Sequence, residues 1–301
     1  MSFKKLIFLT ISAICLVLLS ISASLSEEYV AAKTYGQTSN YKVYSLKLPD
    51  SIEFSGEKFS LKENDLKERM DRELLVNTYW QSNMMLMIKK TSKYFPIIEQ
   101  ILLEEGIPDD FKYLPVIESG LENVRSPKGA KGFWQIMKAT GKELGLEINS
   151  NVDERYNIEL STKAACRYLK KAKQELGSWT LAAASYNRGI SGIKKKIKTQ
   201  QVDNYYDLLL GTETKRYIFR LLAMKIILSN PLKYGFVYEK QDLYFMESLR
   251  EFKIDTAISN ISDFAKKKGI NYKILKRHNP WLLENHLNNN SRKLYKLKVP
   301  E

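Results

Sequence analysis

Helical spacing dominates the middle of the chain. From about residue 65 to residue 230, apolar side chains recur mostly three and four residues apart, as they do on one face of an amphipathic helix. The alternation of short strands with helices that indicates a parallel sheet does not occur in this stretch of sequence. We therefore expect an all-α domain, with helices over 65–105, 109–119, 158–176, 179–186 and 213–229.

Glycine and proline mark the ends of these helices. Gly120 and Gly177 stand just past two of them, where a left-handed backbone is favoured. Pro108, followed by two aspartates, suits the first turn of the helix at 109–119. Pro115 lies inside that same helix, so we expect a kink or a shortened helix there.

The parts on either side of this domain have a different pattern. Residues 25–64 contain short alternating stretches and predict an extended arm that wraps the helical domain. Residues 231–254 predict a linker with short extended stretches. Residues 255–301 predict a small basic α+β module, with a helix at 258–268, a turn at Gly269, a second helix at 272–277 and a strand at 294–299.

The N-terminus is typical of an exported protein. Lys4 and Lys5 precede an uncharged stretch that ends in small residues, so residues 1–24 predict a signal peptide cleaved near Ala23 or Ser24. The alternative is an uncleaved anchor, because about 20 uncharged residues are enough to span a bilayer. We expect a periplasmic or cell-envelope location, with membrane contact only if this segment is retained.

Composition narrows the class of protein. Hydrophobic residues at 44% and charged residues at 27% describe a globular chain, and the net charge of +14 suits a polyanionic partner or an anionic envelope surface. Motifs for nucleic-acid recognition do not appear in the sequence. Cys166 is the one cysteine left after signal removal and lies in a helical pattern, so we expect a buried, inert thiol. His278 and His286 lack partners at ligand spacing, and we expect no metal and no cofactor.

Glu118 is the candidate for proton transfer. It closes the apolar run 111–117 in the last turn of a helix, so burial and the negative helix end should both raise the pKa of its carboxyl. A general acid for cleavage of a glycosidic bond needs such a carboxyl. Considered alone, Glu118 is more typical of a solvated glutamate at a helix end than of a catalytic acid.

A second carboxylate is not obvious. Glu122, Asp153 and Glu154 are near Glu118 in sequence only, and the last two suit the start of the following helix. A site with one acid works if the substrate supplies its own nucleophile. The acid, once deprotonated, then serves as the base for a substrate hydroxyl.

Three motifs together resemble the soluble-lytic-transglycosylase family: Ile117-Glu-Ser-Gly-Leu121, Gly129-Ala-Lys-Gly-Phe-Trp-Gln-Ile136 and Ala183-Ala-Ser-Tyr-Asn-Arg-Gly189. The resemblance implies a lysozyme-like helical fold and assigns Glu118 as the sole catalytic acid and base. It also implies peptidoglycan as substrate, cut between N-acetylmuramic acid and N-acetylglucosamine without water. The muramic C6 hydroxyl attacks C1 and leaves a 1,6-anhydro end.

Further site residues follow from the resemblance. Ser119 takes the position that helps to hold the substrate or the carboxylate, and Gln135 the position that contacts the sugar at the cleavage subsite. Tyr186 and Asn187 match residues that line the same cleft, and we expect Tyr186 to hydrogen-bond Glu118.

Two more aromatic residues belong to the expected site. Tyr217 resembles a further tyrosine of the family's cleft. Trp134 stands where many members have a smaller residue, and its indole suits either stacking on a sugar face or packing in the core.

Residues 255–301 resemble a degenerate LysM carbohydrate-binding module that lacks the usual opening glycine before Asp255. Glycan binding and a packing or spacer role both remain open for it. The resulting hypothesis is an exported peptidoglycan lytic transglycosylase whose partners are glycan strands, with envelope proteins as a further class of partner. The alternatives are a goose-type lysozyme, which admits water, and an inactive glycan-binding scaffold.

Overall fold

The computed structural model describes residues 42–301, and residues 46–301 form one unit. The predicted signal at 1–24 and the first part of the arm at 25–64 lie outside the described residues. Within the described range, no helix is both long enough and apolar enough to cross a bilayer. The fold is mainly α, as the sequence predicts.

Two long helices open the helical domain. They are α2 (Asn64–Tyr79) and α3 (Gln81–Glu104), where the sequence indicated one continuous helical stretch. The middle contains α6 (Ile158–Leu176), α7 (Trp179–Arg188) and α9 (Thr212–Ser229), within a residue or two of their predicted bounds. The sequence analysis missed two shorter helices, α5 (Lys138–Glu143) and α8 (Ile190–Gln200).

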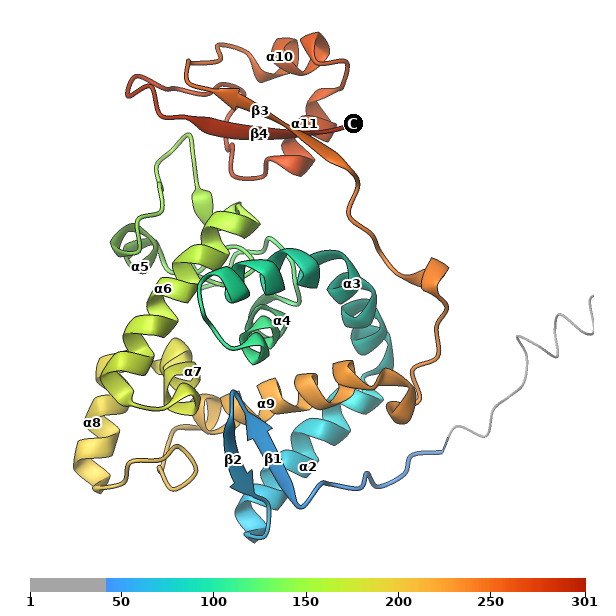
Figure 1. Cartoon of the computed structure of the whole chain (residues 1–301), viewed down its shortest axis with the longest axis vertical. Helices are drawn as coiled ribbons and strands as arrows, with labels where there is room; N and C mark the ends of the chain where they lie inside the picture. Colours follow the sequence, from blue (N-terminus) through green and yellow to red (C-terminus); the bar gives the residue numbers. More distant parts are fainter. Residues whose placement is uncertain (1–41) are drawn as a thin grey trace, which may run out of the picture. The chain divides into compact units, whose positions relative to one another are not determined.

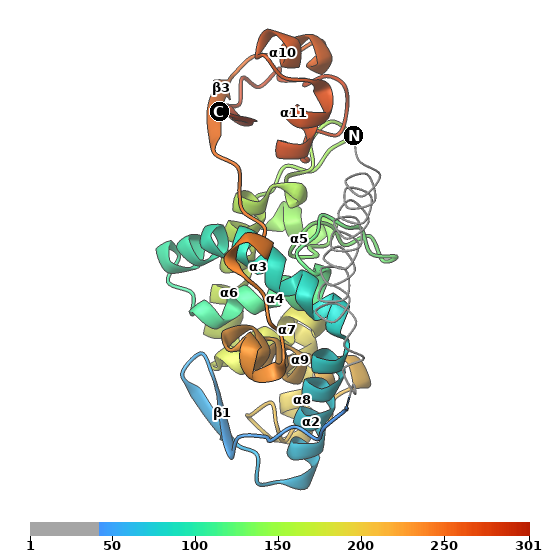
Figure 2. The same ribbon diagram turned by 90° about the vertical axis from the view of Figure 1, so that its right-hand side faces the viewer.

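A short helix, α4 (Leu114–Ser119), carries the candidate acid. It follows the 3-10 helix η1 (Asp109–Tyr113), so the predicted single helix is divided just before Pro115, which occupies the first turn of α4. Gly120 ends α4 with a left-handed backbone at φ 63°. Figures 1 and 2 both show α4 enclosed by α3, α6, α7 and α9.

The N-terminal arm contains a β-hairpin. Strands β1 (Ser51–Phe54) and β2 (Glu57–Ser60) pair antiparallel, and the buried side chain of Phe54 packs edge-on against Phe111 of η1. The Glu57 carboxylate accepts hydrogen bonds from the backbone N–H groups of Trp179 and Thr180 at 2.6 and 3.0 Å. It therefore binds the unpaired donors at the start of α7 and fixes the hairpin to the helical domain.

The C-terminal module contains two strands and two short helices. Strands β3 (Leu249–Ile254) and β4 (Tyr295–Pro300) pair antiparallel over six positions, beside α10 (Ile261–Lys267) and α11 (Tyr272–His278). The predicted linker therefore contains the first strand of the module, a correction of its boundary. The first helix begins at Ile261, not at 258, because the Asn260 side chain caps it there.

The segment between α5 and α6 binds the module directly. Asn151 donates a side-chain hydrogen bond to the carbonyl of His286 at 2.7 Å and accepts one from the backbone of Asn288 at 2.8 Å. The backbone N–H of Asp153 donates to the carbonyl of Trp281 at 2.9 Å. Val152, only 1% exposed, packs within the apolar cluster of the module.

Candidate active site

Glu118 lies in the last turn of α4 with its side chain partly buried. The hydroxyl of Tyr217, a buried residue of α9, donates a hydrogen bond to Oε1 of Glu118 at 2.5 Å. The sequence analysis expected Tyr186 to make this contact, and that expectation was wrong. The Tyr186 hydroxyl instead donates to the carbonyl of Trp134 at 2.8 Å, because α7 directs it at the loop that contains Trp134.

The pKa of the Glu118 carboxyl is raised above its usual value. Burial is the largest cause, and the charge of Glu213 adds to it. The hydrogen bond from Tyr217 and the positive charge of Arg220 partly offset this rise in the pKa. Arg220 is held beside α4 by its own hydrogen bond to the carbonyl of Ile117 at 3.0 Å. The direction of the pKa shift is the one expected from the apolar run in the sequence.

The three candidates for a second carboxylate, all of which follow Glu118 in the sequence, form ion pairs with other residues. Glu122 pairs with Lys90 and is largely exposed. Asp153 is buried and pairs with Arg155 at 2.8 Å, while Glu154 pairs with a lysine of the C-terminal module. Each therefore has a structural partner, and none of the three hydrogen-bonds Glu118 within residues 42–301.

Ser119 and Gln135 both make hydrogen bonds to backbone. The Ser119 hydroxyl donates to the carbonyls of Pro115 and Phe133 at 3.0 and 2.8 Å, which fixes α4 to the loop at 129–136. Gln135 has a left-handed backbone at φ 46°, and its amide donates to the carbonyl of Gly132 at 2.8 Å. In this structure both side chains shape the loop beside Glu118. Their contact with a sugar stays a prediction.

Arg155 also holds the loop at 129–136 in place, and this role was not predicted from the sequence. Its buried guanidinium donates to the carbonyls of Gly129 and Ile136 at 3.2 and 3.1 Å and is neutralised by Asp153. Gly132 passes so close to this segment that a Cβ there would lie 1.9 Å from the Arg155 carbonyl oxygen. The adjacent charges Asp153-Glu-Arg155 were the available signal, but they were interpreted as helix-end charges.

Trp134 is a core residue. Its side chain is 0% exposed, and its indole N–H donates to the hydroxyl of Thr162 at 2.8 Å. Stacking on a sugar face, one of the two roles expected from the sequence, is wrong for this structure because no part of the ring is accessible. Asn187, half-buried, accepts a hydrogen bond from the Thr214 hydroxyl at 2.7 Å, which joins α7 to α9.

The remaining reactive side chains have structural roles. Burial raises the pKa of the Cys166 thiol to about 12, so this thiol is inert at neutral pH, as expected. His278 does have a carboxylate neighbour, contrary to the expectation, because Glu247 lies 3.2 Å from its ring. Across residues 42–301 no group of histidine, cysteine and carboxylate side chains is arranged to hold a metal ion.

Family comparison agrees with the motifs. Residues 96–208 match the transglycosylase SLT domain, and residues 250–301 match the soluble lytic transglycosylase C-terminal LysM-like domain. Residues 96–208 are therefore an SLT domain, and the helical part of the chain is the lysozyme-like domain expected from the three motifs.

Individual relatives are consistent with this assignment. Membrane-bound lytic murein transglycosylase D of Escherichia coli is 30% identical over 184 residues in strains K12 and O6:H1. The match covers 59% of this chain and 40% of that protein, so the chain spans about two fifths of its length. A putative tributyltin chloride resistance protein of Alteromonas sp. strain M-1 is 29% identical, over 36% of this chain and 58% of that protein.

Solved structures also match this chain. One of them is an inactive mutant of the lytic transglycosylase Slt from Pseudomonas aeruginosa, 18% identical over 62% of this chain and 36% of that chain. The TM-score is 0.36, which is too low to carry any argument about this protein.

Proposed function

We propose that this protein is a peptidoglycan lytic transglycosylase in which Glu118 is the general acid and then the general base. The observation that carries the proposal is a single partly buried carboxyl with a raised pKa, held by a phenol inside a helical transglycosylase domain. A raised pKa keeps the carboxyl protonated closer to neutral pH, as the first step requires.

In the first step, Glu118 gives its proton to the glycosidic oxygen between N-acetylmuramic acid and N-acetylglucosamine, and the bond from C1 to that oxygen breaks. The Glu118 carboxylate then removes the proton from the muramic C6 hydroxyl, whose oxygen forms the new bond to C1. No water is consumed, and the carboxyl ends the cycle protonated. Because Tyr217 binds Oε1, Oε2 is the oxygen that carries the transferred proton.

The surroundings of Glu118 suit both of its states. Burial favours the neutral acid before the first proton transfer. Tyr217 and Arg220 favour the carboxylate after it, so the group is left as a base poised for the second transfer. A second carboxylate is not needed, because the substrate hydroxyl takes the place of an enzyme nucleophile or an activated water.

Product analysis of digested sacculi tests the reaction. Mass spectrometry should find 1,6-anhydromuramic ends. Hydrated reducing ends would instead show that water is the acceptor, as in a goose-type lysozyme. Glu118→Gln should reduce lysis at least about 100-fold, the usual contribution of a general acid. Glu122→Gln is the matched control, because Glu122 is exposed and paired with Lys90, and it should keep nearly full activity.

Loss of lysis in both variants, or in neither, would remove Glu118 from the mechanism. Absence of lysis by the native chain would favour a glycan-binding scaffold. We also propose a periplasmic or envelope location, which is where the substrate is found and which agrees with the basic charge of +14. N-terminal sequencing of the exported protein tests cleavage near Ala23 or Ser24.

A further inference from the structure

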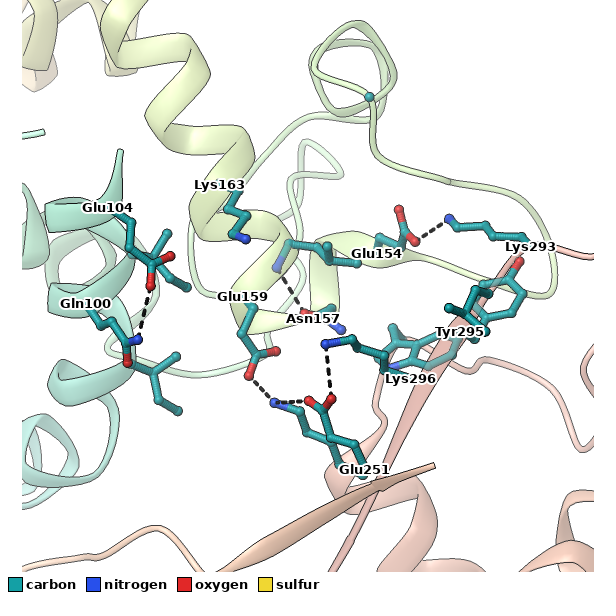
Figure 3. Close-up of a pocket in the computed structure, with 17 residues that line it drawn as sticks. Gln100, Glu104, Glu154, Asn157, Glu159, Lys163, Glu251, Lys293, Tyr295 and Lys296 are labelled. Atoms are coloured by element: carbon teal, nitrogen blue, oxygen red, sulfur yellow. Dashed lines mark hydrogen bonds and ion pairs between the residues drawn. The ribbon is translucent and has the colours of Figure 1, made fainter. Parts of the chain in front are cut away.

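A cavity of about 690 Å³ lies where the helical domain meets the C-terminal module. One wall comes from the C-terminal half of α3 and the start of α6, and the other comes mainly from β4 (Figure 3). The size is that of a site for a small organic ligand. None of the roles proposed above for Glu118 and its neighbours uses this cavity.

The apolar part of the cavity has an unexpected member. By its spacing Leu160 belongs to the apolar face of α6, yet this residue is 37% exposed and lines the cavity. Ile97 and Ile101 of α3 also line it, and the stacked rings of Trp281 and Tyr295, with centroids 5.4 Å apart, form a rigid part of the opposite wall. The cavity therefore offers apolar surface for a ligand that is not purely ionic.

The charged side chains of the two walls differ in whether they have an ion-pair partner. On the side of the module, lysines are paired with glutamates: Lys293 with Glu154 at 2.6 Å, and Lys296 with Glu251 at 3.1 Å. On the helical side, the half-buried Lys163 of α6 makes no hydrogen bond or ion pair within residues 42–301. Its charge acts on the nearby Glu105 carboxyl, but the Lys163 ammonium has no direct partner among the described residues and is available to an anionic ligand group.

Glu104 of α3 has the opposite charge and is similarly available. It accepts a hydrogen bond from the amide of Gln100 at 3.0 Å but has no cationic partner in the described part of the chain. Since α3 and α6 pack against each other, Glu104 and Lys163 extend from neighbouring helices into the same space (Figure 3). A ligand with one ammonium and one carboxylate group would neutralise both.

We propose that this cavity binds a short zwitterionic peptide, its ammonium group at Glu104 and its carboxylate at Lys163. If the chain acts on peptidoglycan as proposed above, the peptide is the stem that substitutes the lactyl group of muramic acid and carries free amino and carboxyl groups. A glycan without its peptides carries lactyl carboxylates but no ammonium group, so it offers nothing to pair with Glu104. The proposal thus adds a site for the peptide part of the substrate to the site for its sugars.

A second cavity, of about 300 Å³, adjoins this one. It shares part of the lining, including Asn157, Glu159 and Trp281, and is also lined by Phe133. The Phe133 carbonyl accepts the hydroxyl of Ser119, the residue that follows Glu118. The second cavity therefore reaches the loop beside Glu118.

Titration of the full-length exported protein with a defined peptide tests this inference. The probe is the tripeptide L-alanyl-γ-D-glutamyl-meso-diaminopimelate, with its N-acetylated form and neutral chitotetraose as comparison ligands. Calorimetry should show binding of the free tripeptide. Acetylation of its amines, Glu104→Gln or Lys163→Ala should each weaken binding about threefold to tenfold, as expected for partly exposed charge pairs.

Matched variants control for a general loss of charge. Lys171→Ala changes an exposed lysine further along α6, and Glu143→Gln changes an exposed glutamate of α5; neither residue lines the cavity. Both should bind the tripeptide as the native chain does. Equal weakening by the control variants would overturn the proposal, as would binding of chitotetraose, but not of the tripeptide, with a dependence on Lys163.

The binding assay needs no catalysis, so the two proposals fail separately. Tripeptide binding that depends on Lys163 and Glu104, in a chain that makes hydrated ends, would support the peptide site and reject the transglycosylase reaction. Lysis that depends on Glu118, without measurable tripeptide binding at millimolar concentration, would reject the peptide site alone.

Discussion

Tyr217 and Glu118 are 99 positions apart in the sequence, and the structure joins them by a hydrogen bond of 2.5 Å from phenol to carboxyl. The bond depends on how α9 is placed. One residue earlier, Arg216 pairs with the buried Glu73 of α2 at 2.6 Å, and α2 and α9 pack along each other. The ion pair between Arg216 and Glu73 therefore helps to hold α9, and with it Tyr217, in place.

Tyr217→Phe should change the pH dependence of lysis. The phenol lowers the pKa of Glu118, so its removal should raise that pKa further and move the alkaline limb of kcat/KM to higher pH. Activity at the optimum should fall about 10- to 100-fold, since a hydrogen bond to a charged group is lost. A pH–rate profile with soluble glycan chains measures both effects.

Tyr205→Phe is the control for this variant, because Tyr205 is also buried and also donates from its phenol, but to the carbonyl of Thr214 at 2.7 Å. Its profile should match that of the native chain. An alkaline limb that stays in place in Tyr217→Phe would mean that the phenol does not act on the group that titrates in lysis.

Glu118→Gln should stabilise the fold at neutral pH. Burial raises the pKa of Glu118 in the folded state, so the native chain binds this proton more tightly folded than unfolded. Its stability is therefore fully present below the unfolded pKa of about 4.5 and decreases as the pH rises through the folded pKa. Urea unfolding at pH 4 and pH 7 should show the advantage of the variant only at the higher pH. An advantage that is independent of pH would contradict this account.

Gly132→Ala should disrupt the loop beside Glu118, because the new Cβ would overlap the Arg155 carbonyl at 1.9 Å. We expect a loss of at least about 3 kcal/mol in the free energy of unfolding, the range of severe core changes. Gly129→Ala is the comparison: its backbone is also left-handed, at φ 88°, but nothing lies within 4 Å of a Cβ. That variant should lose only about 1–2 kcal/mol, from backbone strain. Similar losses in urea unfolding would show that the close approach is relieved by movement.

Trp134→Phe tests the core role of this residue. The smaller ring leaves a void and removes the donor to Thr162, so the free energy of unfolding should decrease by about 1–3 kcal/mol with little change in KM. Trp80→Phe, at a position 59% exposed, should change it by less than about 0.5 kcal/mol. A raised KM with unchanged stability would instead indicate sugar stacking.

Local rules predicted the helices well. Glycine and proline have conformational effects that do not depend on the rest of the fold, so the end of α4 at Gly120 and its start near Pro115 were predictable. The raised pKa of Glu118 was also predictable, because the apolar run that buries it precedes it directly in the sequence.

Contacts between distant segments were harder to predict. Whether Tyr186 or Tyr217 reaches Glu118 depends on how α7 and α9 pack around α4, and the family resemblance assigns both tyrosines to the same cleft. The role of Arg155 behind the motif loop was hidden for the same reason. Leu160 fits the buried face of α6 by spacing, but the fold leaves a cavity over that position.

Val152 is a residue of the helical part of the chain that completes the apolar cluster of the module. The adjacent Asp153 neutralises the arginine that supports the motif loop. The C-terminal module and the loop at 129–136 therefore both depend on the short segment that contains Val152 and Asp153. Replacing the module with another domain would require new residues at 151–153. Those same substitutions would also alter the support of the loop beside Glu118, so a change of the module cannot be made independently of that loop.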